Sequence, residues 1–99
     1  MTNHPLDEFR RRATAAHGQG VRAFGRLLEL AEAGHGDQAR AIAVFLASLY
    51  DGEAFPFDLY ALRGVDVAIS DDMLLCLDTL RWGKADMHEH IPDGRQRVH

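Results

Sequence analysis

Residues 66–83 read DVAISDDMLLCLDTLRWG, and this stretch decides the fold of the 99-residue chain. Its apolar residues recur mostly every three or four positions, which is the spacing that places side chains on one face of an α-helix. That face consists of Ile69, Met73, Cys76, Leu77 and Leu80. We predict a helix that begins at Asp66 or Ser70 and stops at Gly83, because acidic and hydroxyl side chains cap helix starts and glycine ends helices.

Two more amphipathic segments precede this stretch, at residues 21–33 and 37–50. The first apolar face contains Val21, Phe24, Leu27, Leu28 and Ala31, and the second contains Ala39, Ile42, Phe45, Leu46, Leu49 and Tyr50. We predict two helices, with Asp37 as the N-cap of the second and Gly52 as its left-handed terminator. The short loop between them predicts an antiparallel hairpin with helix 37–50 at the centre of the core.

A connector with a brief helix joins this hairpin to the last helix. Pro56 cannot donate a backbone hydrogen bond and favours an extended Phe55, so this segment is not the interior of a helix. Asp58 then suits the N-cap of a brief helix that ends at Gly64.

The N-terminal segment is predicted from a proline and two glycines. Pro5 suits a first helical turn, which predicts a short helix over residues 5–16 or an arm that becomes ordered on binding. We expect Gly18 and Gly20 to interrupt that helix before the next one begins.

The C-terminal segment carries a turn signature. Pro92, Asp93 and Gly94 lie between two arms of alternating residues, which favours a β-hairpin. Two strands alone are marginal in water, so this hairpin has to pack on the helices. The apolar residues for that packing are Met87, Ile91 and Val98.

The predicted fold class is therefore mostly α. We expect a small helical bundle of three longer helices and one or two short ones, with a C-terminal β-hairpin. The predicted divisions are an N-terminal helix or arm at 1–18, a helical core at 19–83, and a hairpin packed on that core at 84–99.

The charge is unevenly distributed along the chain. The net charge is -4, and residues 51–99 carry ten acidic against five basic residues. Such a half repels phosphate backbones and attracts basic protein surfaces. We therefore expect a protein partner and do not expect this half to bind nucleic acid. A homodimer is a further alternative, and we expect no membrane binding because the chain has no long apolar run. The residues proposed for protein binding are Asp58, Asp66, Asp71, Asp72 and Trp82.

Each of these residues also has a purely structural interpretation. Asp71 and Asp72 lie early in the predicted helix, where carboxylates gain from the amide dipoles. Adjacent helical residues diverge by about 100°, so the two acids do not form a catalytic pair. Trp82 stands at a helix end, where a ring commonly closes the edge of a small core.

Three further features bear on chemistry and location. His88 and His90 project from one face of a strand and could bind a metal ion, or they are two solvent-facing histidines. Arg10, Arg11 and Arg12 could contact phosphates from a mobile arm, or they form a solvated helix face. The single cysteine and the absence of a long apolar run predict a buried, inert thiol and a cytoplasmic protein.

The chain resembles a family of small uncharacterised proteins carried on plasmids and integrative elements of proteobacteria. The resemblance runs from Arg26 to Val98 and rests on RLLELA, ARAIAVFLASLYDG, FPFDLYALRGVDVAISDDMLLCLDTLRW, and a histidine near a glycine turn, here His88 and Gly94. Residues 57–74 are its most specific part. The resemblance implies a mobile-element context and a compact helical domain, and it implies no reaction.

These observations favour a non-enzymatic accessory protein of a mobile element that binds another protein through its acidic second half. No nucleophile, base and oxyanion donor can be assembled from the motifs, so we expect neither catalysis nor a cofactor. One alternative is a dimeric DNA-associated regulator that contacts DNA through the arginines at residues 10–12. The other alternative is a metal-binding module at His88 and His90.

Overall fold

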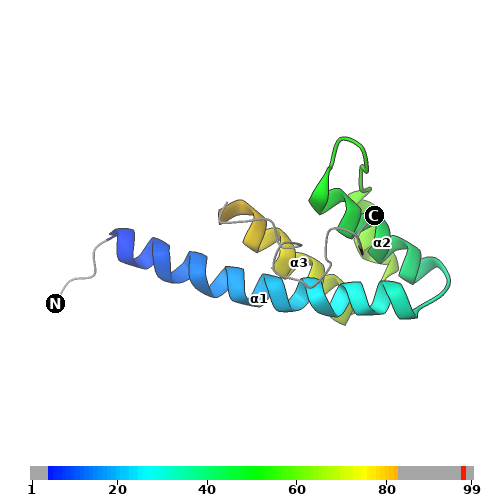
Figure 1. The fold of residues 1–99 in the computed structure, drawn as a ribbon, viewed down its shortest axis with the longest axis horizontal. Coiled ribbons are helices and arrows are strands. Elements are labelled where there is room, and N and C mark those ends of the chain that lie inside the picture. Colours follow the sequence, from blue (N-terminus) through cyan, green and yellow to red (C-terminus); the bar gives the residue numbers. More distant parts are fainter. Residues whose placement is uncertain (1–4, 83–96, 98–99) are drawn as a thin grey trace.

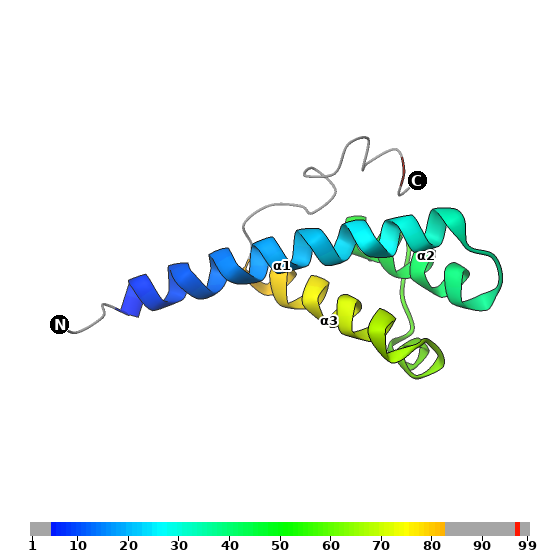
Figure 2. The same ribbon diagram turned by 90° about the horizontal axis from the view of Figure 1, so that it is seen from below.

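The computed structural model describes residues 5–82 and residue 97, and those residues form three α-helices and one 3-10 helix (Figures 1 and 2). The elements follow one another as α1 (Pro5–Ala33), α2 (Asp37–Tyr50), η1 (Leu59–Gly64) and α3 (Val67–Trp82). The long helix α1 runs the length of the structure, α3 lies along it, and α2 folds back beside its C-terminal part (Figures 1 and 2). Most contacts between elements join α1 to α3.

Helix α1 is a single helix of 29 residues, so the predicted interruption at Gly18 and Gly20 is wrong. A glycine inside a helix costs only about 1 kcal/mol relative to alanine, and tertiary packing can offset that cost. Asp7 and Glu8 lie in the first turn, where carboxylates favour the positive end of the helix dipole.

Gly20 is required because α3 crosses α1 closely at this point. A Cβ atom at Gly20 would lie 2.6 Å from Thr79 Cβ, well inside van der Waals contact. The Thr79 hydroxyl donates a hydrogen bond of 2.5 Å to the carbonyl oxygen of Ala16 and also bonds the carbonyl of Leu75 at 3.0 Å. Small residues line the buried side of α1 along this crossing, namely Ala13, Ala16, Gly20 and Ala23.

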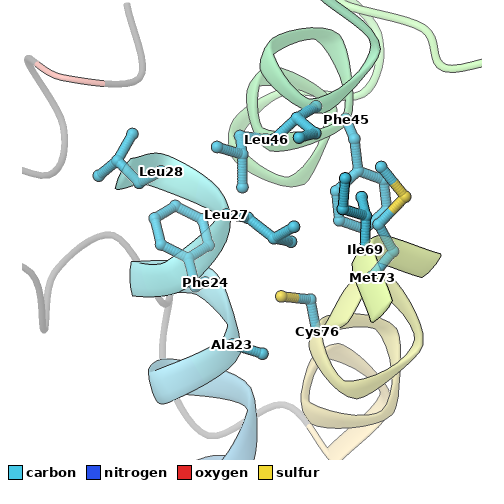
Figure 3. Packing of buried hydrophobic residues seen from close by; sticks show 10 residues of the cluster. Ala23, Phe24, Leu27, Leu28, Phe45, Leu46, Ile69, Met73 and Cys76 are labelled. Atoms are coloured by element: carbon cyan, nitrogen blue, oxygen red, sulfur yellow. The ribbon is translucent and has the colours of Figure 1, made fainter. Parts of the chain in front are cut away.

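The hydrophobic core lies where all three α-helices meet (Figure 3). Its buried residues are Ala23, Phe24, Leu27, Leu28, Ile42, Phe45, Leu46, Ile69, Met73 and Cys76. Helix α1 contacts both α2 and α3 and is therefore the central element, whereas we predicted α2 in that position. On α3, Leu80 is exposed and Thr79 is buried instead, because the face of α3 that meets α1 requires a small polar side chain there.

The turn between α1 and α2 depends on Gly36, which has a φ of 90° and is the N-cap of α2. The predicted cap at Asp37 is wrong, because Asp37 lies in the first turn and forms an ion pair of 3.3 Å with Arg40. Helix α2 ends at the extended residue Asp51, whose carboxylate accepts hydrogen bonds from the amides of Glu53 and Ala54. Asp51 therefore performs the role that we predicted for Gly52.

The short helix η1 confirms the predicted cap at Asp58, whose side chain accepts a 3.0 Å hydrogen bond from the Tyr60 amide. Asp66 precedes α3, and its carbonyl accepts hydrogen bonds from the amides of Ile69 and Ser70. The Asp66 amide donates to Gln38 Oε1 at 2.5 Å, which ties the start of α3 to α2.

The predicted fold class needs correction, because the described residues are helices and turns and include no strand. The predicted β-hairpin at 84–99 lies outside the described residues except for Arg97, which is helical. Arg97 pairs with Glu32 on α1 through two hydrogen bonds, of 2.9 and 2.5 Å. A turn signature with short arms is a weak determinant of structure, since an isolated hairpin has little stability of its own.

Within the described residues, no helix has both the length and the apolar character that crossing a membrane requires.

The two neighbouring glycines of α1 provide a matched test of this packing. We expect Gly20→Ala to lower the free energy of unfolding by about 1–3 kcal/mol, because the new methyl group overlaps Thr79. Gly18→Ala should raise it by about 1 kcal/mol, since the nearest atom to its Cβ is Nη1 of the flexible Arg22 side chain, 3.6 Å away. Urea unfolding of both variants measures the difference, and equal effects would contradict the close crossing.

Candidate protein-binding groove

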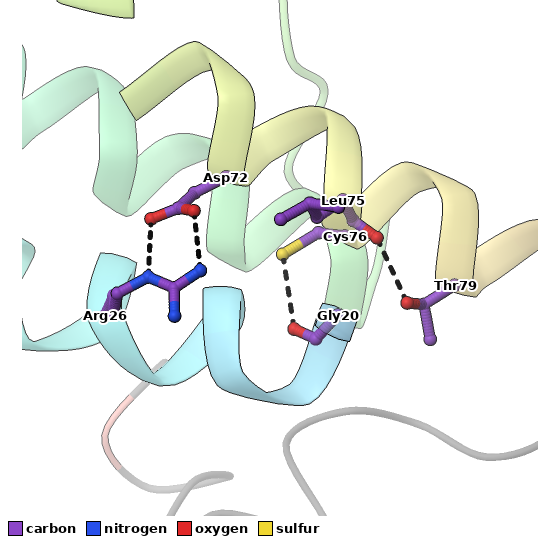
Figure 4. A network of polar contacts seen from close by, with 6 residues as sticks. All are labelled: Gly20, Arg26, Asp72, Leu75, Cys76 and Thr79. Carbon is purple, nitrogen blue, oxygen red and sulfur yellow. Dashed lines mark hydrogen bonds and ion pairs between the residues drawn. The ribbon is translucent and has the colours of Figure 1, made fainter. Parts of the chain in front are cut away.

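A bidentate ion pair joins α1 to α3 beside the core (Figure 4). Arg26 Nε donates to Asp72 Oδ2 at 3.0 Å, and Arg26 Nη2 donates to Asp72 Oδ1 at 2.8 Å. The Asp72 side chain is only 15% exposed, whereas that of Arg26 is 52% exposed. These hydrogen bonds raise the pKa of Arg26 above its ordinary value, so the guanidinium stays charged.

A groove of about 670 Å³ opens between α1 and α3 next to this ion pair. Its lining residues are Arg26, Glu29, Leu30, Ala33, Ala68, Ile69, Asp71 and Asp72. Leu30 is 46% exposed although it is a large apolar side chain. The groove therefore combines apolar walls from both helices with three carboxylates and one guanidinium, and that guanidinium is already paired.

The described side chains that line the groove are apolar or charged. Among the described residues, the lining includes no serine, threonine, cysteine, histidine or lysine, which are the usual sources of nucleophiles and proton-transfer groups besides carboxylates. The Cys76 thiol lies in the core and faces the Gly20 carbonyl at 3.8 Å (Figure 4). No group of three potential metal ligands occurs among residues 5–82 and 97.

The structure separates the four predicted acidic binding residues into two groups. Asp71 and Asp72 both line the groove, Asp71 exposed and Asp72 paired with Arg26. Asp58 caps η1, and Asp66 makes backbone hydrogen bonds at the start of α3, so both have structural roles.

Trp82 lies at the other end of α3, in a cluster with the N-terminal part of α1. Phe9 meets its ring edge-on, with 5.0 Å between ring centroids and an interplanar angle of 78°. The guanidinium groups of Arg12 and Arg81 lie 5.3 and 4.8 Å from the ring centroid, within the range of cation–π attraction. The indole therefore fastens α3 to α1.

The predicted phosphate-binding arginines lie on the ordered helix α1. Arg11 forms an ion pair of 2.7 Å with Glu8, and Arg12 lies over Trp82. Arg10 is exposed and has no ion pair with any residue in the described part of the chain. The predicted metal ligands His88 and His90 lie outside the described residues.

Sequence reasoning missed the α1 half of the groove. Glu29, Leu30 and Ala33 were assigned no function, because they lie off the apolar stripe of residues 21–33. The one available signal was Leu30, a large apolar residue outside that stripe, and such residues commonly mark contact surfaces when they cluster with others.

A family model matches residues 21–99, which include every residue that lines the groove. The chain belongs to DUF7673, a family of unknown function. No curated protein and no solved structure matches this DUF7673 chain.

The Arg26–Asp72 pair makes a testable contribution to stability in this DUF7673 protein. We expect Asp72→Asn to lower the free energy of unfolding by about 1 kcal/mol, because half of the ion pair faces solvent. The exposed pair of Arg40 and Asp37 is the matched control, and Asp37→Asn should change stability by less than about 0.5 kcal/mol. An equal effect of both substitutions in urea unfolding would contradict the role given to Asp72.

The buried thiol predicts a fall in stability at alkaline pH. Burial, with a smaller contribution from Asp72, raises the pKa of Cys76 to about 12 from its ordinary value of 9.0. Between these two values the unfolded chain binds fewer protons than the folded chain, so the free energy of unfolding falls as pH rises.

Urea unfolding between about pH 8 and pH 11 measures this slope. Cys76→Ala should unfold at lower urea concentration and lose this contribution to the slope. An unchanged slope in that variant would show that other groups cause the alkaline instability.

Proposed function

We propose that this DUF7673 protein is a non-enzymatic protein-binding module whose α1–α3 groove takes an amphipathic helix with basic residues from a partner protein. A single observation carries the proposal: the half-exposed side chain of Leu30 lies in a groove with carboxylates on both of its helices. A groove between two helices that binds the apolar face of a third is a recurrent mode of peptide recognition.

The shape and apolar content of the groove support a helix as its occupant. Ala33 on α1 and Ala68 on α3 are small and exposed, so a helix can approach both backbones closely. Ile69 belongs to the core and also lines the groove, so the groove rests on packed and rigid structure. A preformed surface loses little conformational entropy when it binds.

The charges of the groove support a basic partner. Glu29 on α1 and Asp71 on α3 are exposed acids on opposite helices. The charge of Asp72 is neutralised by Arg26. An apolar strip between two acids complements a helix whose apolar face is bordered by lysine or arginine. Pairs of exposed charges are screened by salt, so binding at this groove should weaken as the salt concentration rises.

The context of this function rests on the resemblance of residues 26–98 to proteins of mobile elements. We propose that the partner is a protein of the host cell or of the element, and that the two meet in the cytoplasm. The buried thiol is compatible with that compartment, since cytosolic cysteines stay reduced. The DNA-binding alternative is less favoured, because Arg11 and Arg12 make contacts within the chain.

The test uses a synthetic helical peptide of about 18 residues, with leucines at the spacing of one helix face and lysines on both borders. We expect it to shift the backbone amide resonances of Leu30, Ala33 and Ala68 in the isotope-labelled full chain. The same peptide with glutamates in place of lysines should bind at least about tenfold more weakly.

A matched pair of variants localises the binding. Ala68→Arg places a long cation in the groove and should weaken peptide binding by at least about tenfold. Ala43→Arg introduces the same change on the exposed face of α2, outside the groove, and should leave binding unchanged. Equal affinities of the two variants, or amide shifts confined to residues outside the groove, would overturn the proposal.

A further inference from the structure

We infer that the groove of one copy of this chain takes the first turns of α1 from a second copy. This inference rests on the proposed function, because it names an occupant for the same groove. The occupant is the exposed face of α1 that carries Leu6, Phe9 and Arg10.

This segment has the chemistry that the groove requires. Leu6 is 56% exposed and Phe9 is 53% exposed, although both are large apolar side chains. Leu6 is three residues before Phe9 and four before Arg10, so the three side chains share one face of the helix. Phe9 also contacts the Trp82 ring of its own copy, and more than half of Phe9 and of Leu6 remains exposed.

The charges of the two surfaces are complementary. Arg10 borders the apolar pair and has no ion pair with a described residue. Glu29 and Asp71 are exposed acids of the groove, and no ion pair within the described residues involves either of them. Docking therefore brings the guanidinium of Arg10 to carboxylates that have no ion pair within the described part of the chain, while Leu6 and Phe9 cover the exposed part of Leu30.

The same chain cannot fill its own groove. Phe9 and Leu30 belong to one uninterrupted helix and are 21 residues apart, which at 1.5 Å per residue separates them by about 32 Å along the helix axis. A helix without a break cannot bend back on itself, so the segment has to reach the groove of another copy. Each copy offers one segment and one groove, and the two lie on different sides of α1, so the copies join head to tail.

Self-association of this kind would regulate the binding function. The N-terminal face of a second copy and the basic helix of a partner compete for the same groove. The fraction of grooves that are unoccupied therefore falls as the concentration of the chain rises. A partner therefore binds with a lower apparent affinity at high chain concentration.

The test is the mass of the full chain in solution, measured by sedimentation or light scattering between about 1 µM and 1 mM at low salt. We expect the average mass to rise above that of one copy as the concentration increases. Arg10→Glu and Asp71→Arg should each weaken association by at least about tenfold, because each places like charges together. The double variant Arg10→Glu/Asp71→Arg restores opposite charges and should associate to within about threefold of the original chain.

Two control variants have the same changes in charge at exposed positions away from both surfaces. Arg40→Glu lies on α2 and Glu53→Arg lies in the turn after α2, and both should associate like the original chain. Circular dichroism of all variants verifies that each keeps the helical content of the original chain.

The outcomes distinguish this inference from the proposed function. If the chain stays monomeric while the lysine peptide still shifts the groove resonances, the groove serves another protein and the inference is overturned. If the copies associate but the double variant fails to restore association, the copies meet through a different surface, which also overturns the inference. If neither association nor peptide binding occurs at the groove, both proposals fail.

Discussion

The close crossing of α1 and α3 at Gly20 and Thr79 is the constraint on which the rest of the structure depends. Because Gly20 has no side chain, the Thr79 side chain fits against the backbone of α1, and its hydroxyl donates a hydrogen bond to the Ala16 carbonyl. The same proximity brings Arg26 and Asp72 into bidentate contact further along. The groove opens just beyond that ion pair, so its position follows from the distance at the crossing.

Much of the helical structure could be predicted from the sequence, and the reason is local. The apolar period of 3.6 residues predicted α2, α3 and the second half of α1. The acidic side chain of Asp58 predicted the N-cap of η1. The continuity of α1 could not be predicted in this way. Gly20 is a helix breaker by local propensity, and only the nearness of Thr79, 59 residues later, explains its presence inside a helix.

The candidate groove was predictable only in part, because two helices distant in the sequence build it. The acids of α3 were recognised from their charge, and the same reasoning also selected Asp58 and Asp66, which serve the backbone. Glu29 and Leu30 acquire meaning only when α3 lies beside them. A single sequence does not show which helices pack together, because periodicity identifies the buried face of a helix but not the helix that it contacts.

Helix α1 is held at both ends by residues from the C-terminal part of the chain. Trp82 packs against Phe9 and Arg12 in its first turns, and Arg97 donates hydrogen bonds to Glu32 near its last turn. A displacement at one end of α1 is transmitted to the other end, because the helix runs for eight turns without a break. A force applied near Phe9 would therefore displace the far end of the helix as well, where Glu32 contacts Arg97 and the turn to α2 begins.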